Sequence, residues 1–391
     1  MRWWVRRLAI VAVVVVLAGV AYVGASAIES RRALTLPEPA GGGAVGRRTF
    51  EWTDATRDDA LARAGHAGPR RLSVWMWYPA AAAGGRRAPY APGLWGAVHL
   101  PWPVAWGETR FGSIRTRSVE DARPAAAAGH LVVLSPGLGF SVVQYQSLAE
   151  SLASHGYVVA AFTPTYSANV TVLGGQVVKA SATGRLPDGS LYRQAAHAAA
   201  LRLLATWVAD AEFVARRARH AVGGVRLRPG VLYVGHSFGG ATSLQACHED
   251  RGCLGAVNID GLDIGTVSTS GLAAPMLLLG HAGSCVTALC HPSAPDDRRD
   301  RSVAMGMVRS GTGPTWSVDV GDTAHFDFTD YAAYRLALPL RLLLPLGGHS
   351  GSHGLLAGDE CVLDFLDRAT GVRPRWGCLD GRLPGTTTRA W

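Results

Sequence analysis

A mostly parallel β-sheet with helices on both faces is the fold that this sequence predicts. Short apolar runs recur along the chain and are closed by turn residues, which is the pattern of buried strands. Segments with helical spacing of apolar residues lie between them. Strands that alternate with helices form parallel sheets, and buried parallel strands are continuously apolar, as these runs are. The sequence therefore predicts the α/β class.

The first element is an apolar segment that predicts export. Arg6 and Arg7 precede an apolar run from Leu8 to Ile28, which is 21 residues long and is long enough to cross a hydrocarbon core about 30 Å thick. Residues 25–27 (Ala-Ser-Ala) also fit a signal-peptide cleavage site. Basic residues before such a segment stay in the cytoplasm. Residues 1–28 are therefore expected to be either a signal peptide or an N-terminal membrane anchor, with an extracytoplasmic body.

The rest of the chain is expected to be a linker followed by one domain. Residues 29–48 include a stretch rich in Pro, Ala and Gly, which is typical of a flexible linker. Residues 49–391 are expected to form a single catalytic domain. We expect strands at residues 72–78, 131–134, 157–162, 231–234, 254–259, 276–279 and 316–320, and helices at residues 145–154, 193–220, directly after residue 237, 331–344 and 360–368. The acidic pair at 296–297 is expected to lie in a surface loop.

Charge and composition exclude several functions. The net charge is +9, yet Lys179 is the only lysine and the arginines are scattered along the chain. Nucleic-acid binding needs a basic cluster or stripe, and the sequence has none. Zinc-site spacing of cysteines is also missing. We therefore expect neither a nucleic-acid partner nor a metal or other cofactor.

The six cysteines lie in the second half of the chain and fall into three short-range pairs. Such pairs are typical of disulfides in an oxidising compartment, although six cysteines allow fifteen connectivities. The pairs suggested by proximity are Cys247 with Cys253, Cys285 with Cys290, and Cys361 with Cys378.

The strongest motif is Gly235-His236-Ser237-Phe238-Gly239, which follows an apolar strand and precedes a helical run. This is the context of a nucleophile elbow, in which a strained strand-to-helix turn exposes the serine and the glycines permit close backbone approach. We therefore expect Ser237 to be a nucleophile.

A nucleophilic serine needs a base and an acid, and in such enzymes the chain order is serine, acid, histidine. His325 follows the last expected strand, where a loop can return to the serine, whereas His281 comes too early. Asp260 ends the strand after the nucleophile, and Asp263 is the alternative acid. We expect Asp260 to orient the His325 imidazole.

The developing oxyanion needs two backbone N–H donors. One is expected at Phe238, directly after the nucleophile, and the other in the loop after an early strand. That loop is Ser135-Pro-Gly-Leu-Gly-Phe, so the second donor is expected at Leu138.

These motifs resemble a known family. The segments Ser135-Pro-Gly-Leu-Gly, Leu152-Ala-Ser-His-Gly-Tyr-Val-Val-Ala-Ala and Gly235-His-Ser-Phe-Gly-Gly-Ala-Thr are similar to the platelet-activating-factor acetylhydrolase type II family and its bacterial lipase-like relatives, in the α/β-hydrolase superfamily. The resemblance covers about residues 70–335. It implies the α/β-hydrolase fold and metal-independent hydrolysis of short or oxidised acyl esters, including phospholipids. It assigns the triad to Ser237, Asp260 and His325.

The expected function is an exported serine esterase that acts on small ester or lipid substrates. An envelope acyltransferase with the same triad and a catalytically silent envelope binding protein are the alternatives. A Trp-rich insert at residues 94–111 is open to two interpretations. It is either an interfacial or acyl-binding flap, since tryptophan favours the membrane–water boundary, or a loop packed over the core.

Overall fold

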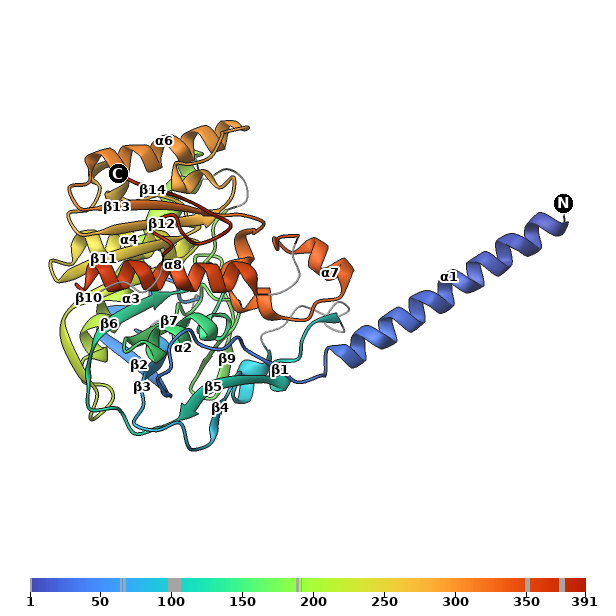
Figure 1. Cartoon of the computed structure of the whole chain (residues 1–391), viewed down its shortest axis with the longest axis horizontal. Helices are drawn as coiled ribbons and strands as arrows, with labels where there is room; N and C mark the ends of the chain where they lie inside the picture. Colours follow the sequence, from blue (N-terminus) through green and yellow to red (C-terminus); the bar gives the residue numbers. More distant parts are fainter. Residues whose placement is uncertain are drawn as a thin grey trace.

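A single mixed sheet organises the body of the protein (Figure 1). In the computed structural model, which describes residues 2–63, 65, 68–97, 107–187, 190, 192–348, 352–372 and 377–391, twelve strands join this sheet. In sheet order they are β1 (Leu34–Thr35), β5 (Ile114–Glu120), β2 (Val45–Asp58), β3 (Pro69–Pro79), β7 (Val158–Thr163), β6 (Ala128–Ser135), β10 (Arg226–His236), β11 (Cys253–Ile259), β12 (Met276–His281), β13 (Thr315–Val320) and β14 (Thr386–Ala390), with β4 (Arg87–Pro89) paired to β5. The strands from β7 to β13 run parallel.

Helices and short turns fill the connections. The α-helices are α1 (Arg2–Glu29), α2 (Gln146–Ser154), α3 (Gln194–Ala218), α4 (Phe238–Glu249), α5 (Val267–Ser270), α6 (Pro295–Ser310), α7 (Leu338–Leu343) and α8 (His353–Ala369). The 3-10 turns are η1 (Gly93–Ala97), η3 (Phe111–Ser113), η4 (Val142–Tyr145), η5 (Cys285–Thr287), η6 (His325–Phe328) and η7 (Asp330–Ala333), and β8 (Thr171–Leu173) and β9 (Gln176–Val178) form a separate hairpin.

Side chains of the central strands point alternately to two apolar cores. In β6, Val132 and Leu134 pack with residues of α2 and α8 on one face, whereas Leu131 and Val133 pack with residues of α3, α4 and α6 on the other. This alternation follows from the two-residue period of a strand. Both faces are buried, which explains why these strands are apolar throughout. The predicted fold class is confirmed.

All seven expected strands are present, but three further strands of five or more residues were not expected. β2, β5 and β14 flank the parallel strands, and β2 and β14 run antiparallel to their partners β3 and β13. Buried and exposed residues are mixed along β2, whose sequence includes Arg47, Arg48 and Asp54. A strand with this composition has no apolar run, so it leaves little signal in the sequence.

Two expected elements differ in the structure. Residues 331–344 do not form one helix, because the backbone at Thr109 and Gly107 pairs with Arg335 and Ala337 and holds this stretch extended between η7 and α7. Residues 296–297 lie in α6 and not in a loop. Asp297 accepts hydrogen bonds from backbone N–H groups that precede the helix, and an acidic first turn favours a helix start.

The segment at residues 29–48 was expected to be a flexible linker, but it lies along the body. Leu34 and Thr35 pair with β5 as β1, Leu36 is fully buried, and Gly41 donates a hydrogen bond to the Ser154 hydroxyl. Strand β2 already begins at Val45. The apolar leucines explain the difference, because they supply buried contacts that a flexible linker lacks.

Helix α1 projects from the body (Figure 1). Residues Trp3–Glu29 are long and apolar enough to cross a membrane. This is what either a membrane anchor or a signal segment requires.

The three disulfides join the pairs that proximity suggested: Cys247–Cys253, Cys285–Cys290 and Cys361–Cys378. Each closes a loop of the second half of the chain, at the end of α4, in the turn after β12, and between α8 and the C-terminal strand.

The described ends of the Trp-rich insert are packed into the core. Trp95 is buried edge-on against Trp75, and Phe111 is buried against Tyr90 and Tyr334. The insert's Trp102 and Trp106 lie outside the described residues. At its two ends, therefore, the insert has the character of a packed loop.

Candidate active site

The turn between β10 and α4 presents Ser237 at the carboxyl edge of the sheet. Ser237 has a positive φ of 56° and its N–H donates to the Ile259 carbonyl, 2.8 Å away. Glycines make this turn possible. A Cβ at Gly235 would lie 2.0 Å from the Gly239 carbonyl oxygen, and a Cβ at Gly239 would lie 2.2 Å from the Ser135 carbonyl oxygen. Only glycine tolerates such approach.

His325 and Asp260 complete a hydrogen-bonded chain with this serine. The His325 Nε2 lies 2.9 Å from the Ser237 Oγ, and its Nδ1 lies 2.6 Å from Oδ2 of Asp260. A carboxylate oxygen can only accept, so Nδ1 carries the proton and Nε2 is free to accept the serine proton. The three residues come from the ends of β10, β11 and β13, which neighbour or nearly neighbour one another in the sheet.

Asp260 is held as an anion in a buried position. Its side chain is 1% exposed. Burial alone would raise the pKa of Asp260, but hydrogen bonds from His281 and His325 outweigh it and hold the pKa well below its ordinary value. The backbone at Asp260 also has a positive φ of 52°. The carboxylate is therefore fixed in charge and in direction.

The alternative acid, Asp263, takes no part in this chain. Its Oδ1 accepts a hydrogen bond from Asn258, whose side chain also bonds Gly261. Burial raises the pKa of Asp263 well above its ordinary value, which favours a neutral carboxyl group. Asp263 and Asn258 therefore belong to the turn that supports Asp260.

A second histidine, His281, shares the carboxylate of Asp260. Its Nδ1 lies 2.8 Å from the same Oδ2 that binds His325. The hydrogen bond to Asp260 raises the pKa of His281, against the effect of its partial burial. Sequence reasoning placed His281 too early for a base and did not foresee this contact. The signal was available, because β12 directly follows β11 and the carboxyl ends of parallel neighbours meet.

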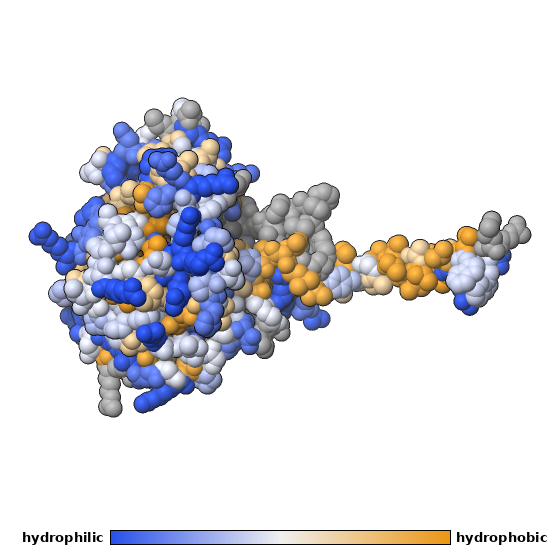
Figure 2. All heavy atoms as spheres, turned by 90° about the horizontal axis from the view of Figure 1, so that it is seen from above, coloured by the Kyte–Doolittle hydropathy of each residue, from blue (hydrophilic) through white to orange (hydrophobic). Residues whose placement is uncertain are grey.

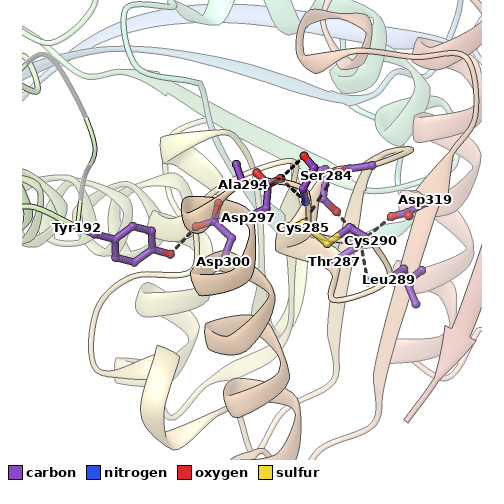
Figure 3. Close-up of a disulfide and its surroundings, with 12 residues drawn as sticks. Tyr192, Ser284, Cys285, Thr287, Leu289, Cys290, Ala294, Asp297, Asp300 and Asp319 are labelled. Carbon is purple, nitrogen blue, oxygen red and sulfur yellow. Dashed lines mark hydrogen bonds between the residues drawn. A yellow bond between two sulfur atoms is a disulfide. The ribbon is translucent and has the colours of Figure 1, made fainter.

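The turn after His281 is braced by a disulfide (Figure 3). Cys285 and Cys290 are joined, and between them Thr287 donates a hydrogen bond to Asp319 on β13, 2.6 Å away. Burial raises the pKa of Asp319 to about 6. Figure 3 also shows Tyr192 beside Asp300 and Asp297 beside Ala294, which tie α6 to its surroundings.

The loop after β6 lies against Ser237, and this is the loop in which the sequence predicts an oxyanion donor. A Cβ at Gly137 would lie 3.3 Å from Ser237 Cβ. Within the described part of the chain, the Leu138 and Phe238 N–H groups have no hydrogen-bond partner. These are the two donors that the sequence suggested.

His236, the residue before the nucleophile, connects the two loops around the serine. Its Nε2 lies 2.9 Å from the His325 carbonyl oxygen, and its Nδ1 lies 2.9 Å from the Tyr145 hydroxyl. The Gly137 N–H donates to that same hydroxyl. Burial and the nearby His325 lower the pKa of His236 to about 3, so the ring is neutral. Nε2–H then donates to the carbonyl and Nδ1 accepts from Tyr145.

No cluster of three or more metal-ligating side chains occurs within the described ranges. The chemistry that this arrangement can support is attack by the serine oxygen, with proton transfer to His325.

Comparison with known proteins relates this geometry to solved structures. No family model and no curated protein sequence matches the chain. Among solved structures, a ferulic acid esterase from Streptomyces cinnamoneus matches with a TM-score of 0.74 and 28% identity, covering 91% of this chain and 99% of that one.

The chain has the α/β-hydrolase fold. The likeness places this hydrolase in the superfamily and supports a carboxylic-ester hydrolase. It does not single out the platelet-activating-factor acetylhydrolase family that the motifs resemble.

Proposed function

We propose that this chain is an extracytoplasmic serine esterase that hydrolyses short-chain or phospholipid-type carboxylic esters. The observation that carries the proposal is the hydrogen-bonded chain from the Ser237 Oγ through His325 to Asp260. The similarity to an esterase structure supports the reaction class. The motif resemblance supports short-chain and phospholipid-type acyl esters as the substrates. The side chain of His325 is 30% exposed, so a substrate can reach the base.

The proposed reaction proceeds in two halves. The Ser237 oxygen attacks the ester carbonyl carbon while its proton moves to the Nε2 of His325, and the Leu138 and Phe238 N–H groups bind the oxyanion. Collapse breaks the bond to the alcohol, which leaves with the proton from His325. Water then repeats the sequence on the acyl-enzyme, with loss of the carboxylic acid and recovery of the serine. Asp260 stabilises the imidazolium throughout.

The first test is Ser237→Ala, with Ser268→Ala as the control. Ser268 is a partly buried serine in α5 whose hydroxyl donates to the Gly265 carbonyl of its own turn. We expect Ser237→Ala to stop turnover of p-nitrophenyl butyrate and labelling by a fluorophosphonate, with an unchanged circular dichroism spectrum. Turnover at the wild-type rate in Ser237→Ala contradicts the proposal.

The acyl specificity is tested with a series of p-nitrophenyl esters of increasing chain length and with methyl ferulate, the kind of ester named for the structural neighbour. We expect the shortest acyl groups to be hydrolysed fastest. Preference for the ferulate contradicts the proposed acyl class and leaves the triad intact. Addition of alcohol acceptors separates hydrolysis from acyl transfer, since a transferase converts the acyl-enzyme to a new ester.

The N-terminal segment is proposed to remain as a membrane anchor. Helix α1 continues past Ala27, where a signal peptidase would cut, and its end is bound to the body. Ser30 is 4% exposed, its carbonyl accepts from the Arg110 N–H, and Glu29 forms an ion pair with Arg335 at 3.3 Å. N-terminal sequencing of the protein from washed membranes tests this. A mature protein that starts at Ile28 overturns it.

A further inference from the structure

The short helix α7 presents an apolar surface beside the base of α1. Leu338, Leu342 and Leu343 are 61%, 76% and 76% exposed. Leu338 and Leu342 are four residues apart and therefore share one face of the helix. Figure 2 shows apolar surface on the body close to the point where α1 leaves it. Exposed leucines that gather on one short helix are unusual at a protein surface, and they indicate a contact site.

Helix α7 is fixed directly to α1. The Leu338 N–H donates to the Tyr22 hydroxyl at 2.8 Å, and Arg335, just before α7, pairs with Glu29 and donates to the Ala33 carbonyl. An open hollow of about 530 Å³ lies between the two helices and is lined by residues of both. The position of α7 along the axis of α1 is therefore defined.

That position corresponds to a depth in a bilayer. A hydrocarbon core about 30 Å thick takes about 20 helical residues, so a span that starts at Leu8 ends near Ala27. Tyr22 precedes Ala27 by five residues, which places it roughly 8 Å inside that end at 1.5 Å per residue. Interfacial helices bury their apolar face about 5–10 Å into the boundary between headgroups and acyl chains. Because Leu338 is bonded to Tyr22, α7 begins at this depth.

We propose that α7 inserts its leucines into the outer leaflet of the same bilayer that α1 spans, so that the hydrolase body is seated on the membrane. The occupant of this apolar surface is thus the lipid bilayer, and neither a second protein nor another segment of the chain is required. Basic Arg335 precedes the apolar positions and Arg341 lies between Leu338 and Leu342, and both suit the anionic headgroup region.

The residues that directly follow α7 are hydrogen-bonded to the loop that carries His325. The Phe326 N–H donates to the carbonyl of Pro345, two residues after α7, and the Gly347 N–H donates to Asp327 at 2.5 Å. Asp327 also accepts from the Ala324 N–H. Lipid contact at α7 therefore holds the histidine loop beside the membrane surface. It follows, and this step rests on the proposed esterase function, that esters embedded in that bilayer are favoured substrates.

The insertion is tested by fluorescence quenching in the full-length protein. All six native cysteines are paired in disulfides, so Leu343→Cys supplies a single thiol for an environment-sensitive fluorophore. Val372→Cys is the matched control, because Val372 is also an exposed apolar residue, at 47%, and it lines a different hollow with Gly43 and His155. Both proteins are placed in vesicles of phosphatidylethanolamine and phosphatidylglycerol that contain lipid brominated on the acyl chains.

We expect bromolipid to quench the label at 343 at least threefold more strongly than the label at 372. Equal, weak quenching at both positions in protein that resists carbonate extraction overturns the proposal, because α1 is then in the bilayer and α7 is not. This readout does not depend on catalysis.

The consequence for substrates is tested with the double variant Leu342→Asn, Leu343→Asn. We expect about a tenfold loss of hexadecyl acetate hydrolysis in vesicles and unchanged hydrolysis of soluble p-nitrophenyl butyrate, by analogy with the loss of a few buried leucine contacts. Equal vesicle rates in the variant and the wild type overturn the substrate step. Absence of both activities in the wild type contradicts the proposed function and leaves the quenching result standing.

Discussion

The serine and the histidine of the proposed triad lie in regions that are built in opposite ways. Around Ser237, the second half of strand β10 and most of helix α4 are buried, and they are joined by a turn of glycines in close backbone contact. Around His325, the described residues between β13 and α8 form short turns and one short helix with exposed leucines. The nucleophile is thus positioned by its sequence neighbours.

The histidine is positioned by distant residues instead. Asp330, five residues after it, is buried and accepts hydrogen bonds from the Tyr90 hydroxyl and from the N–H groups of Gln146 and Ser147 at the start of α2. Burial raises the pKa of Asp330 to about 6, although these bonds lower it. The difference teaches that the turn at Ser237 needs only local sequence, whereas the loop that carries His325 depends on contacts from two distant parts of the chain, Tyr90 and the start of α2.

The largest expected effect comes from Asp260, because it serves both regions. Asp260→Asn removes the negative charge and presents an amide to His325, which favours the wrong tautomer. We expect kcat for p-nitrophenyl butyrate to fall by about 10⁴-fold. Asp322→Asn is the control, since Asp322 also has a positive φ of 54° and lies exposed in the histidine loop. A loss below tenfold in Asp260→Asn means that the two loops are not joined through this carboxylate.

The bridge between the two regions is the Tyr145 hydroxyl. Tyr145→Phe leaves the Gly137 N–H and His236 Nδ1 without their partner, at a cost of about 1–3 kcal/mol. If that cost falls on the oxyanion and base loops, kcat drops about 10- to 100-fold while KM changes little.

Tyr157→Phe is the matched comparison for this bridge, because its buried hydroxyl bonds Asp367 far along the chain from the site. It should lower the melting temperature by a similar amount and leave kcat unchanged. Equal kcat values in the two variants contradict a coupling role for Tyr145.

These two regions also differ in how far the sequence predicts them. The strand, the glycines and Ser237 form one continuous motif, so the elbow is predicted from local pattern. His325 and Asp260 were placed by chain order and by their positions after expected strands, and their meeting depends on strand order in the sheet. The contacts of His281 and Tyr145 were not predicted, because no local pattern shows that His281 faces the Asp260 carboxylate or that Tyr145 faces the loop after β6.

The same limit explains the differences in the fold. The apolar parallel strands were predicted, since burial on both faces leaves a clear signal. Strand β2 and the extended stretch before α7 were not, because their conformation is set by pairing with distant backbone. The segment before β2 has linker composition, yet it is held by Leu36 and by contact with Ser154.

His236, next to Ser237, makes the free energy of unfolding depend on pH in the acid range. Its pKa is about 3 when folded, below its ordinary value of 6.5 when unfolded, so the unfolded chain binds the extra proton. This contribution to stability is present above pH 6.5 and is lost as the pH falls from 6.5 toward 3, by up to about 1.4 kcal/mol per pH unit.

Urea unfolding of His236→Gln between pH 4 and pH 7 should therefore show a flatter dependence on pH than the wild type, by about 1 kcal/mol per unit. The matched variant His220→Gln changes an exposed histidine and should keep the wild-type slope. Parallel curves for all three proteins contradict a buried neutral His236.

The smallest effect concerns His281, which faces Asp260, Asp319 and Asp327. By donating to the Asp260 Oδ2, His281 weakens that oxygen as a partner for the His325 imidazolium. Its removal should therefore move the acid limb of the kcat/KM profile toward higher pH.

His281→Phe removes the donor and should show this shift toward higher pH, whereas His281→Gln can keep a donor and should shift less. A full pH profile of kcat/KM for both variants decides it. Identical acid limbs in the two variants and the wild type make His281 only a packing residue.

The positive φ angles of Ser237 and Asp260 have a further consequence. A side-chain-bearing residue in such a conformation costs about 1–3 kcal/mol, and neither position uses glycine, which would adopt it freely. Selection for stability alone would therefore favour glycine at both positions. Such a variant would have a larger free energy of unfolding, but it would lack two of the side chains that the proposed catalysis needs. Thermal stability and turnover therefore make opposite demands at these two positions. Substitutions intended to raise the melting temperature should be made elsewhere in the chain.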